Sequence, residues 1–271
     1  MSKVKATRSL VAPVSATASG SLVATVAPNA AHTIALLERA SATLRDRCAG
    51  VHFGAPVAFT YNPLDYAWQA HRAYLRMAQP APRVLFVGMN PGPFGMAQTG
   101  VPFGEVTAVK DFLGIDAHVA KITAPAHMHA KRPVVGFACQ RSEVSGARVW
   151  SWARERFGTR AKFFQHAFMW NWCPLAFMAA SGANLTPDKL PARTRSAIER
   201  ACDRALVGVV NALEPTMVIG VGAFASDCAS RALGDRLPIH TVLHPSPASP
   251  AANRGWDAAA RRQLRACGFL R

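Results

Sequence analysis

The sequence predicts an α/β fold, a three-layer α/β/α sandwich with a central four-stranded parallel sheet. Four short apolar runs alternate with longer segments whose apolar residues recur at helical spacing, which favours parallel strands joined by helices. The first apolar run leads directly into a loop rich in glycine and proline, residues 88–104. Open α/β sheets place their ligand sites in such loops, at the carboxyl ends of the strands.

The composition favours a nucleic-acid partner and disfavours a membrane protein. Half of the 271 residues are hydrophobic, but no run approaches the roughly 18 apolar residues that a membrane span requires. The 31 Lys and Arg residues outnumber 15 Asp and Glu, for a net charge of +16. This excess indicates an anionic partner, with nucleic acid as the first choice and a surface kept basic for solubility as the alternative.

The six cysteines do not indicate a metal site. Their spacing is wide and irregular and includes no C-x-x-C pair, which disfavours zinc and iron–sulfur binding. We expect mostly buried free thiols in a reducing compartment.

The first 31 residues are expected to form a disordered basic tail. They are rich in Ala, Ser, Thr and Val, carry Lys3, Lys5 and Arg8, and contain no acidic residue. A targeting peptide has a similar composition and is the alternative. No internal repeat and no linker divides residues 32–271, so we expect a single domain there.

Two helices are expected before the first strand. The first begins near His32 and has an apolar stripe formed by Ile34, Leu37, Leu44 and Cys48. The second begins at Asn62-Pro63, because an Asn cap followed by proline favours a helix start. Its buried face consists of Leu64, Trp68, His71 and Leu75. Val84–Gly88 then forms a strand buried on both faces.

The rest of the chain continues the alternation. Glu105–Leu113 is expected to form a helix that stops at Gly114, and residues 115–137 a loop with little regular structure. The later elements are a helix at Ser142–Phe157, a strand at Phe163–Asn171, a helix at Pro187–Glu214, a strand at Thr216–Val221, a helix at Ala223–Leu233, a strand at Ile239–Leu243, and a last helix lined by Trp256, Ala260, Leu264 and Cys267.

Polar side chains stand at three of the four strand ends. Asn90 follows the first strand, Asn171 ends the second, and His244 follows the fourth. Because the carboxyl ends of parallel strands share one edge of a sheet, we expect these three side chains to meet in one pocket. A single Asn or His in a loop is more commonly a turn residue or a polar group with its hydrogen bonds satisfied. The expectation of a shared pocket therefore depends on all three residues standing at equivalent strand ends.

Four segments carry a resemblance to a known family: Gly88–Val106, Gly136–Trp150, Asn171–Ala192 and His244–Trp256. In order and spacing the chain resembles the single-strand-selective monofunctional uracil-DNA glycosylases, from about Pro56 to its C-terminus. The resemblance implies the uracil-DNA glycosylase fold, whose four-stranded parallel sheet agrees with the strand count above. It implies a base excision repair enzyme that hydrolyses the N-glycosidic bond of uracil in single- or double-stranded DNA and leaves an abasic site.

The resemblance assigns substrate-binding roles to four residues. Phe103 provides the face on which a flipped uracil stacks. Asn171 hydrogen-bonds O4 and N3–H of uracil, a pattern that cytosine reverses. Gly92 and Met96 hold a water near C5 through their backbone, and a hydroxymethyl group that displaces this water would admit 5-hydroxymethyluracil.

The resemblance also assigns the catalytic roles. Asn90 stands where some relatives carry Asp, and since an amide is no strong base, it orients the attacking water on a dissociative path. His244 donates a hydrogen bond toward uracil O2, where negative charge develops. The two segments that carry Asn90 and His244 contain no lysine to form a Schiff base, which agrees with a monofunctional enzyme, and the resemblance implies that neither a metal nor a cofactor is needed.

The last motif implies a wedge that enters the duplex, formed by Pro245, Ser246, Pro247, Ala248, Ser249, Pro250 and Asn253. Better-known members carry a basic residue where this chain has Ala248. We therefore expect a weaker grip on duplex DNA and a preference for single strands or loosened pairs, with Arg254 nearby as a compensating charge.

Two other functions stay open, a non-catalytic nucleic-acid-binding module and a glycosylase of the same superfamily acting on deaminated purines. The expected partner is uracil-containing DNA, bound by a monomer away from membranes. The alanine- and arginine-rich composition suggests a bacterial source, and hence the cytoplasm and nucleoid; a eukaryotic source would mean the nucleus.

Overall fold

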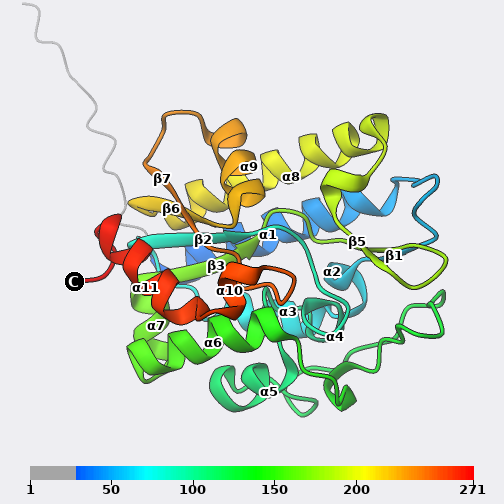
Figure 1. Ribbon diagram of the computed structural model, residues 1–271, viewed down its shortest axis with the longest axis horizontal. Helices are drawn as coiled ribbons and strands as arrows, with labels where there is room; N and C mark the ends of the chain where they lie inside the picture. The colour runs from blue at the N-terminus through cyan, green and yellow to red at the C-terminus, as the bar shows by residue number, and fades with distance from the viewer. Residues whose placement is uncertain (1–28) are drawn as a thin grey trace, which may run out of the picture.

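The computed structural model describes residues 29–271 and has the expected central sheet (Figure 1). Four parallel strands lie in the order β3-β2-β6-β7. Their bounds are β2 at Val84–Gly88, β3 at Ala167–Asn171, β6 at Met217–Val221 and β7 at Ile239–Val242. In register, Gly88 pairs with Asn171, so β2 and the edge strand β3 end side by side. The predicted fold class is confirmed.

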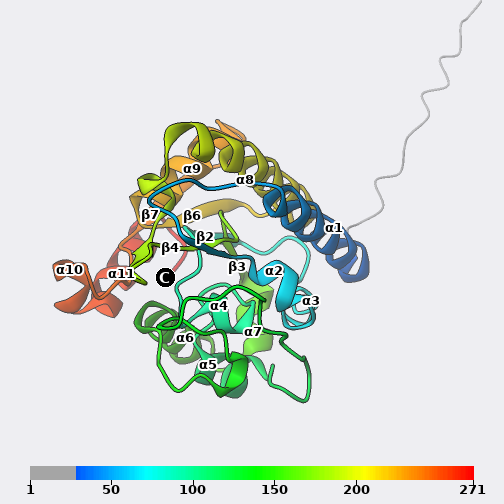
Figure 2. The ribbon, with the colours of Figure 1, turned by 90° about the vertical axis from the view of Figure 1, so that its right-hand side faces the viewer.

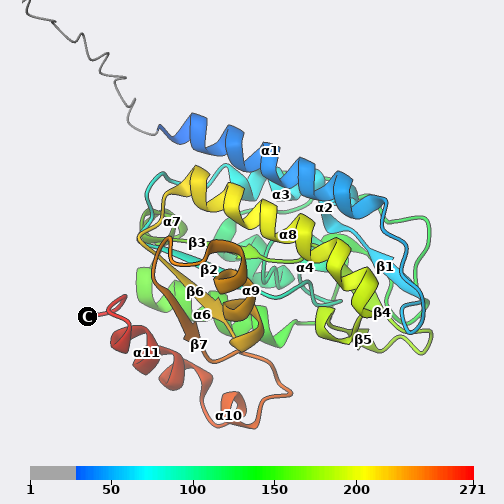
Figure 3. The same ribbon diagram turned by 90° about the horizontal axis from the view of Figure 1, so that it is seen from above.

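Helices cover both faces of this sheet. Figure 2 shows α1 (Ala30–Ala49), α8 (Ala192–Leu213) and α9 (Ala223–Leu233) on one side of it. The other side carries α6 (Val144–Phe157) and α7 (Arg160–His166), and α11 (Trp256–Ala266) lies along the edge near β7. In Figure 3, α1 and α8 run side by side across the top of the molecule.

The first helix, α1, begins at Ala30, capped by the Asn29 side chain, which accepts from the amide of His32. Leu37, Leu44 and Cys48 are buried as expected, whereas Ile34 is half-buried. The predicted basic tail lies almost entirely outside the described residues. Within those residues, no helix is both long and apolar enough to cross a membrane.

The expected strand at Phe163–Asn171 is wrong in its first half. Residues 160–166 form α7, whose start is capped by Thr159 accepting from the amide of Lys162. Phe163 and Phe164 are buried as helical residues, and the strand begins only at Ala167. A short apolar run does not distinguish a buried strand from a buried helical turn, and this cap decides between them.

Two helix boundaries also differ from expectation. The long helix begins at Ala192 instead of Pro187, because Leu190 precedes Pro191 and is held in an extended conformation. The expected helix after Asn62 is broken at Ala67 into α2 (Pro63–Tyr66) and α3 (Trp68–Leu75). Asn62 does not cap it, since its amide nitrogen donates to the Arg45 carbonyl.

A second, small antiparallel sheet was not expected from the sequence. It consists of β1 (Phe59–Tyr61), β4 (Ala176–Met178) and β5 (Asn184–Leu185), in the order β1-β4-β5. Strands of two or three residues are too short to show an alternating pattern. This sheet positions the segment after Asn171 next to the carboxyl edge of the main sheet.

The remaining elements are short; the helical segment expected to stop at Gly114 is confirmed, whereas α4 and α10 were not expected from the sequence. The glycine loop contains α4 (Met96–Thr99), and Glu105 caps α5 (Val106–Ala108), which continues as a π-helical turn at Val109–Leu113 and ends at Gly114. Residues 115–135 carry no helix or strand, and a 3-10 turn follows at Gly136–Ala138. After β7 come α10 (Pro250–Asn253) and then α11.

Candidate active site

One cavity of about 210 Å³ collects the polar side chains from the strand ends. Asn90, Asn171 and His244 all line it, although they are far apart in the sequence. Gly92, Met96 and Phe103 from the glycine loop line it as well, so the structure brings together all six predicted catalytic and substrate-binding residues. The carboxyl edge of the parallel sheet is the reason, since β2, β3 and β7 all end there.

The floor of the cavity depends on a glycine at the end of β2. A Cβ atom at Gly88 would lie 2.3 Å from Asn171 Oδ1 and 2.6 Å from Phe103 Cζ. Only a residue without a side chain therefore lets the Phe103 ring and the Asn171 amide both lie this close to the end of β2. Phe103 itself has a positive φ of 52°, a left-handed conformation that costs a bulky residue free energy and is found mostly where function requires it.

The Asn171 amide is buried and weakly engaged. Its side chain is 5% exposed, and Nδ2 donates to Met96 Sδ at 3.2 Å. A thioether sulfur is a weak acceptor, so most of the hydrogen-bonding capacity of this amide is available to a ligand. A buried amide with unused donors and acceptors favours a ligand that presents the complementary pattern.

The Asn90 amide is oriented by the backbone. Its Nδ2 donates to the Leu175 carbonyl at 3.1 Å, just before β4. Because both nearby acceptors are carbonyl oxygens, the nitrogen faces them and Oδ1 faces the other way. Oδ1 has no hydrogen-bond partner among residues 29–271, which leaves it free to accept from a water molecule.

The His244 imidazole is held as a neutral donor. The backbone amide of Ser246 donates to Nδ1 at 3.1 Å, so the ring proton lies on Nε2. Burial lowers the pKa of His244, which keeps the ring neutral near pH 7. Gly222 lies beside this ring, and a Cβ there would be 3.1 Å from His244 Cβ.

Two buried polar side chains hold the glycine loop rigid. Gln98 donates to the carbonyls of Pro93 and Pro133 and accepts from the amides of Val135 and Gly136, at 2.9–3.1 Å. His71 donates from Nδ1 to the Gly100 carbonyl at 2.8 Å. With every capacity of the Gln98 amide used, the loop is stiff as well as close to the cavity.

The sequence interpretation missed further residues that line the cavity: Met89, Pro91, Glu143, Ser145, Asn184 and Thr186. Glu143 accepts from the amides of Ser145 and Gly146 at 3.1 and 2.7 Å and so caps α6. Burial raises its pKa, and a Cβ at Gly95 would lie 3.0 Å from Glu143 Cγ. A carboxylate directly before a helix is a recognisable cap signal, whereas the positions of Asn184 and Thr186 follow from the small sheet.

The predicted wedge segment lies partly in the cavity wall. Ser246 and Pro247 line the cavity, whereas Pro245 is buried beside it. Ala248, Pro250 and Asn253 are exposed and do not line it. Ser249 caps α10 by accepting from the amide of Ala252. The segment is therefore a short exposed turn next to the cavity mouth.

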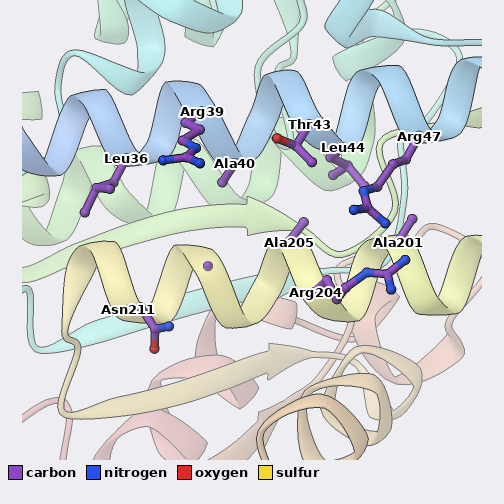
Figure 4. Close-up of a pocket in the computed structure, with 11 residues that line it drawn as sticks. Leu36, Arg39, Ala40, Thr43, Leu44, Arg47, Ala201, Arg204, Ala205 and Asn211 are labelled. Atoms are coloured by element: carbon purple, nitrogen blue, oxygen red, sulfur yellow. The ribbon is translucent and has the colours of Figure 1, made fainter.

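Two other features do not form a competing catalytic site. Among the described residues no group of His, Cys, Asp and Glu could hold a metal ion. A groove of about 320 Å³ lies between α1 and α8 (Figure 4), lined by leucine, alanine and glycine residues, by Thr43 and Asn211, and by the three arginines Arg39, Arg47 and Arg204. This groove contains none of the predicted site residues.

All six cysteines are free, and four of them are buried.

Comparison with known proteins assigns the chain to a family. The family model "Uracil DNA glycosylase superfamily" matches residues 76–265. The chain is 51% identical over 224 residues to the single-strand selective monofunctional uracil-DNA glycosylase of Rattus norvegicus, covering 81% of this chain and 80% of the relative. The corresponding protein of Bos taurus is 48% identical over 231 residues, covering 84% of each chain.

The solved structures agree on the fold. The crystal structure of wild-type Pedobacter heparinus SMUG2 superposes with a TM-score of 0.60 at 15% sequence identity, covering 84% of this chain and 96% of that one. At this identity the likeness shows the fold alone, and the family rests on the family model and on the identity to the curated relatives. The chain belongs to the uracil-DNA glycosylase superfamily, in the family of single-strand selective monofunctional uracil-DNA glycosylases.

Proposed function

We propose that this protein is a base excision repair glycosylase that hydrolyses the N-glycosidic bond between uracil and deoxyribose in DNA. The observation that carries the proposal is the meeting of Asn90, Asn171, His244 and Phe103 in one cavity of a chain about 50% identical to curated uracil-DNA glycosylases. The products are free uracil and an abasic site. A base within a duplex is out of reach of such a cavity, so the nucleotide must be flipped out of the stack.

Recognition of uracil rests on Phe103 and Asn171. The base stacks on the Phe103 ring, and the Asn171 amide donates to O4 and accepts from N3–H. Cytosine presents an amino group and an unprotonated N3 at these atoms, so it would leave the buried amide unpaired. The low exposure of Asn171 and its weak contact with Met96 support this role.

Catalysis rests on Asn90 and His244 and follows a dissociative path. The glycosidic bond breaks first, leaving an oxocarbenium-like sugar and a uracil anion, and water then adds to the sugar. Asn90 Oδ1 holds that water by accepting a hydrogen bond, which its fixed orientation supports. His244 Nε2–H donates toward O2 of the uracil anion, and the contact to Ser246 supports this tautomer.

The C5 edge of the base would face the glycine loop. The backbone of Gly92 and Met96 would hold a water there, and 5-hydroxymethyluracil would enter by displacing it with its own hydroxyl group. A methyl group makes no such hydrogen bonds, so thymine would be disfavoured. The position of Gly92 and Met96 on the cavity wall beside Asn171 supports this arrangement.

The exposed turn at residues 245–253 would act as the wedge on duplex DNA. Ala248 brings no charge to this turn, so we infer that the protein favours single strands or loosened pairs over stable duplexes. The net charge of +16 supplies sequence-independent attraction to the phosphates in either case. We propose that the protein acts as a monomer and that the reaction requires neither a metal nor a cofactor.

The experiment that tests this proposal is excision from a labelled single-stranded oligonucleotide with one deoxyuridine. Asn90→Ala and His244→Ala are compared with the wild-type protein, and alkali is added to cleave abasic sites. We expect strand cleavage only after alkali, and a rate reduced on the order of 100-fold or more in each variant. Binding without excision of uracil from any substrate would contradict the proposal and favour a non-catalytic binding module.

A further inference from the structure

One side chain of α6 holds the turn that follows β7. Arg148 Nη1 donates to the Pro245 carbonyl at 2.9 Å, and Nη2 donates to Asn253 Oδ1 at 3.1 Å. Asn253 in turn donates from Nδ2 to the Pro247 carbonyl at 2.7 Å. The two hydrogen bonds of Arg148 fasten both ends of the 245–253 turn to α6, which lies below α10 in Figure 1, and the Asn253–Pro247 hydrogen bond holds the turn together internally.

These hydrogen bonds lie directly beside His244. The carbonyl that Arg148 holds belongs to the next residue, Pro245. The amide that orients the imidazole belongs to Ser246, one residue further on. A movement of this backbone would therefore move the Nε2–H donor of His244 as well as the exposed turn.

Helix α6 connects this turn to the opposite wall of the cavity. Its first turn contributes Glu143 and Ser145 to the lining, and Gly146 packs under Phe103, where an added Cβ would lie 2.1 Å from the Phe103 carbonyl oxygen. Arg148 lies two residues after Gly146 on the same helix, but it does not line the cavity. Within residues 29–271 it pairs with no carboxylate, and its hydrogen bonds go to the turn.

We propose that Arg148 is a positioning residue, which locks the 245–253 turn to α6 and thereby sets His244 against the wall that carries Phe103. The inference rests on the proposed function for its kinetic part only. The divergent donors of a planar guanidinium reach two acceptors at once, and a lysine ammonium on the same stem does not reproduce this geometry.

A direct contact between Arg148 and a DNA phosphate would be a different role, and it makes different predictions. A phosphate contact needs positive charge, so Arg148→Lys would largely retain it. Loss of the contact in Arg148→Gln would weaken DNA binding and lower the salt dependence of the affinity by about one counterion. A positioning role needs the guanidinium geometry, so lysine and glutamine should behave alike.

The kinetic test measures single-turnover excision of uracil from a single-stranded oligonucleotide at saturating protein. Arg148→Lys and Arg148→Gln should both lower the maximal rate about tenfold or more, since small misplacements of a catalytic group are costly, with little change in the concentration that gives half-saturation. Arg154→Gln is the matched control: the residue lies on the same helix, stacks over Phe112, and should stay within about twofold of wild type. Thermal unfolding of each variant verifies that it is folded.

The second measurement is independent of activity. Hydrogen exchange of the peptide covering residues 244–253, recorded without DNA, should become faster in both Arg148 variants and stay unchanged in Arg154→Gln. If the wild-type protein fails to excise uracil, the proposed function is wrong while this measurement still tests the lock. Unchanged exchange, a wild-type rate in Arg148→Gln, or a wild-type rate in Arg148→Lys would each overturn the inference.

Discussion

At the scale of single residues, the shape of the cavity depends on glycines whose missing side chains leave room for the residues that line it. The Phe103 ring and the Asn171 amide meet over Gly88, and Glu143 packs against Gly92 and Gly95. A Cβ at Gly88 would overlap both groups, and one at Gly95 would lie 3.0 Å from Glu143 Cγ, whereas one at Gly92 would make only ordinary contact at 3.5 Å. Gly88 and Gly95 are therefore constrained by packing against side chains that line the cavity, and only Gly100 among the glycines of the loop itself has a positive φ.

Gly88→Ala should reduce activity far more than stability. The added methyl group would overlap the Phe103 ring and the Asn171 amide, and displacing both should lower the excision rate on the order of 100-fold. Overpacking of this kind costs about 1–3 kcal/mol of folding free energy. Single-turnover kinetics and denaturant unfolding measure the two effects.

Gly54→Ala is the control for this substitution, because a Cβ at Gly54 meets no heavy atom within 4 Å. It should leave the excision rate near that of wild type. Equal rates for Gly88→Ala and Gly54→Ala would contradict the packing argument.

At the scale of elements, the end of β3 is held by a polar bridge between two helices. Trp172 Nε1 donates to Asp203 Oδ1 of α8 at 2.7 Å, and Arg231 of α9 donates twice to the same carboxylate, at 2.8 and 2.9 Å. The Arg231 guanidinium also lies 5.4 Å from the centre of the Trp172 ring. Because Trp172 follows Asn171 directly, this bridge supports the position of a predicted substrate-binding residue.

Asp203→Ala should destabilise the protein by about 2–4 kcal/mol, because it leaves the buried indole N–H and the Arg231 guanidinium without their acceptor. Asp235→Ala removes an exposed carboxylate on the same side and should change the free energy of unfolding by less than about 0.5 kcal/mol. Urea unfolding of both variants measures the difference. A loss below about 1 kcal/mol for Asp203→Ala would show that the bridge is dispensable.

The exposed 245–253 turn carries no charge at Ala248, the position tested for its proposed role on duplex DNA. Ala248→Arg should raise excision from duplex DNA several-fold and leave single-stranded DNA nearly unaffected, since the added charge lies on the exposed turn that would enter the duplex. Ala35→Arg adds the same charge on an exposed position of α1 and serves as the control. Duplex rates that do not rise above those of this control would refute the wedge argument.

At the scale of the whole molecule, the glycine loop is tied to the helical layer through His71 of α3. Its Nδ1 donates to the Gly100 carbonyl, and its Nε2 accepts from Ser41 of α1 at 3.1 Å. Burial lowers the pKa of His71 to about 4. One neutral imidazole thus connects α1, α3 and the loop that lines the active site.

This burial predicts a loss of stability in mild acid. The unfolded chain takes up a proton at His71 below about pH 6.5, whereas the folded chain resists until about pH 4, so stability is complete above pH 6.5 and falls between these values. The contribution should be about 2 kcal/mol smaller at pH 5 than at pH 7.5. Urea unfolding of wild type and His71→Asn at both pH values measures it. An equal fall in the two proteins would exclude His71 as its source.

Local patterns in the sequence predicted most of the architecture. The parallel strands were predicted by their apolar runs, and α9 has the expected bounds, because helical periodicity and buried runs are properties of neighbouring residues. The strand at Phe163–Asn171 was partly wrong because the apolar pair Phe163 and Phe164 fits a buried helical turn as well as a strand. The small sheet was missed because its strands are too short for any pattern.

The sequence by itself determined the fold class and, through its motifs, the family. It also determined that Asn90, Asn171 and His244 meet, because the carboxyl ends of parallel strands lie at one edge of the sheet. Only the tertiary structure decided the other walls of the cavity, formed by Glu143, Ser145 and the β5 segment, and the lock between Arg148 and Asn253. These contacts join residues that are distant in the sequence, so they leave no periodic signal, and their geometry exists only once the helices are packed on the sheet.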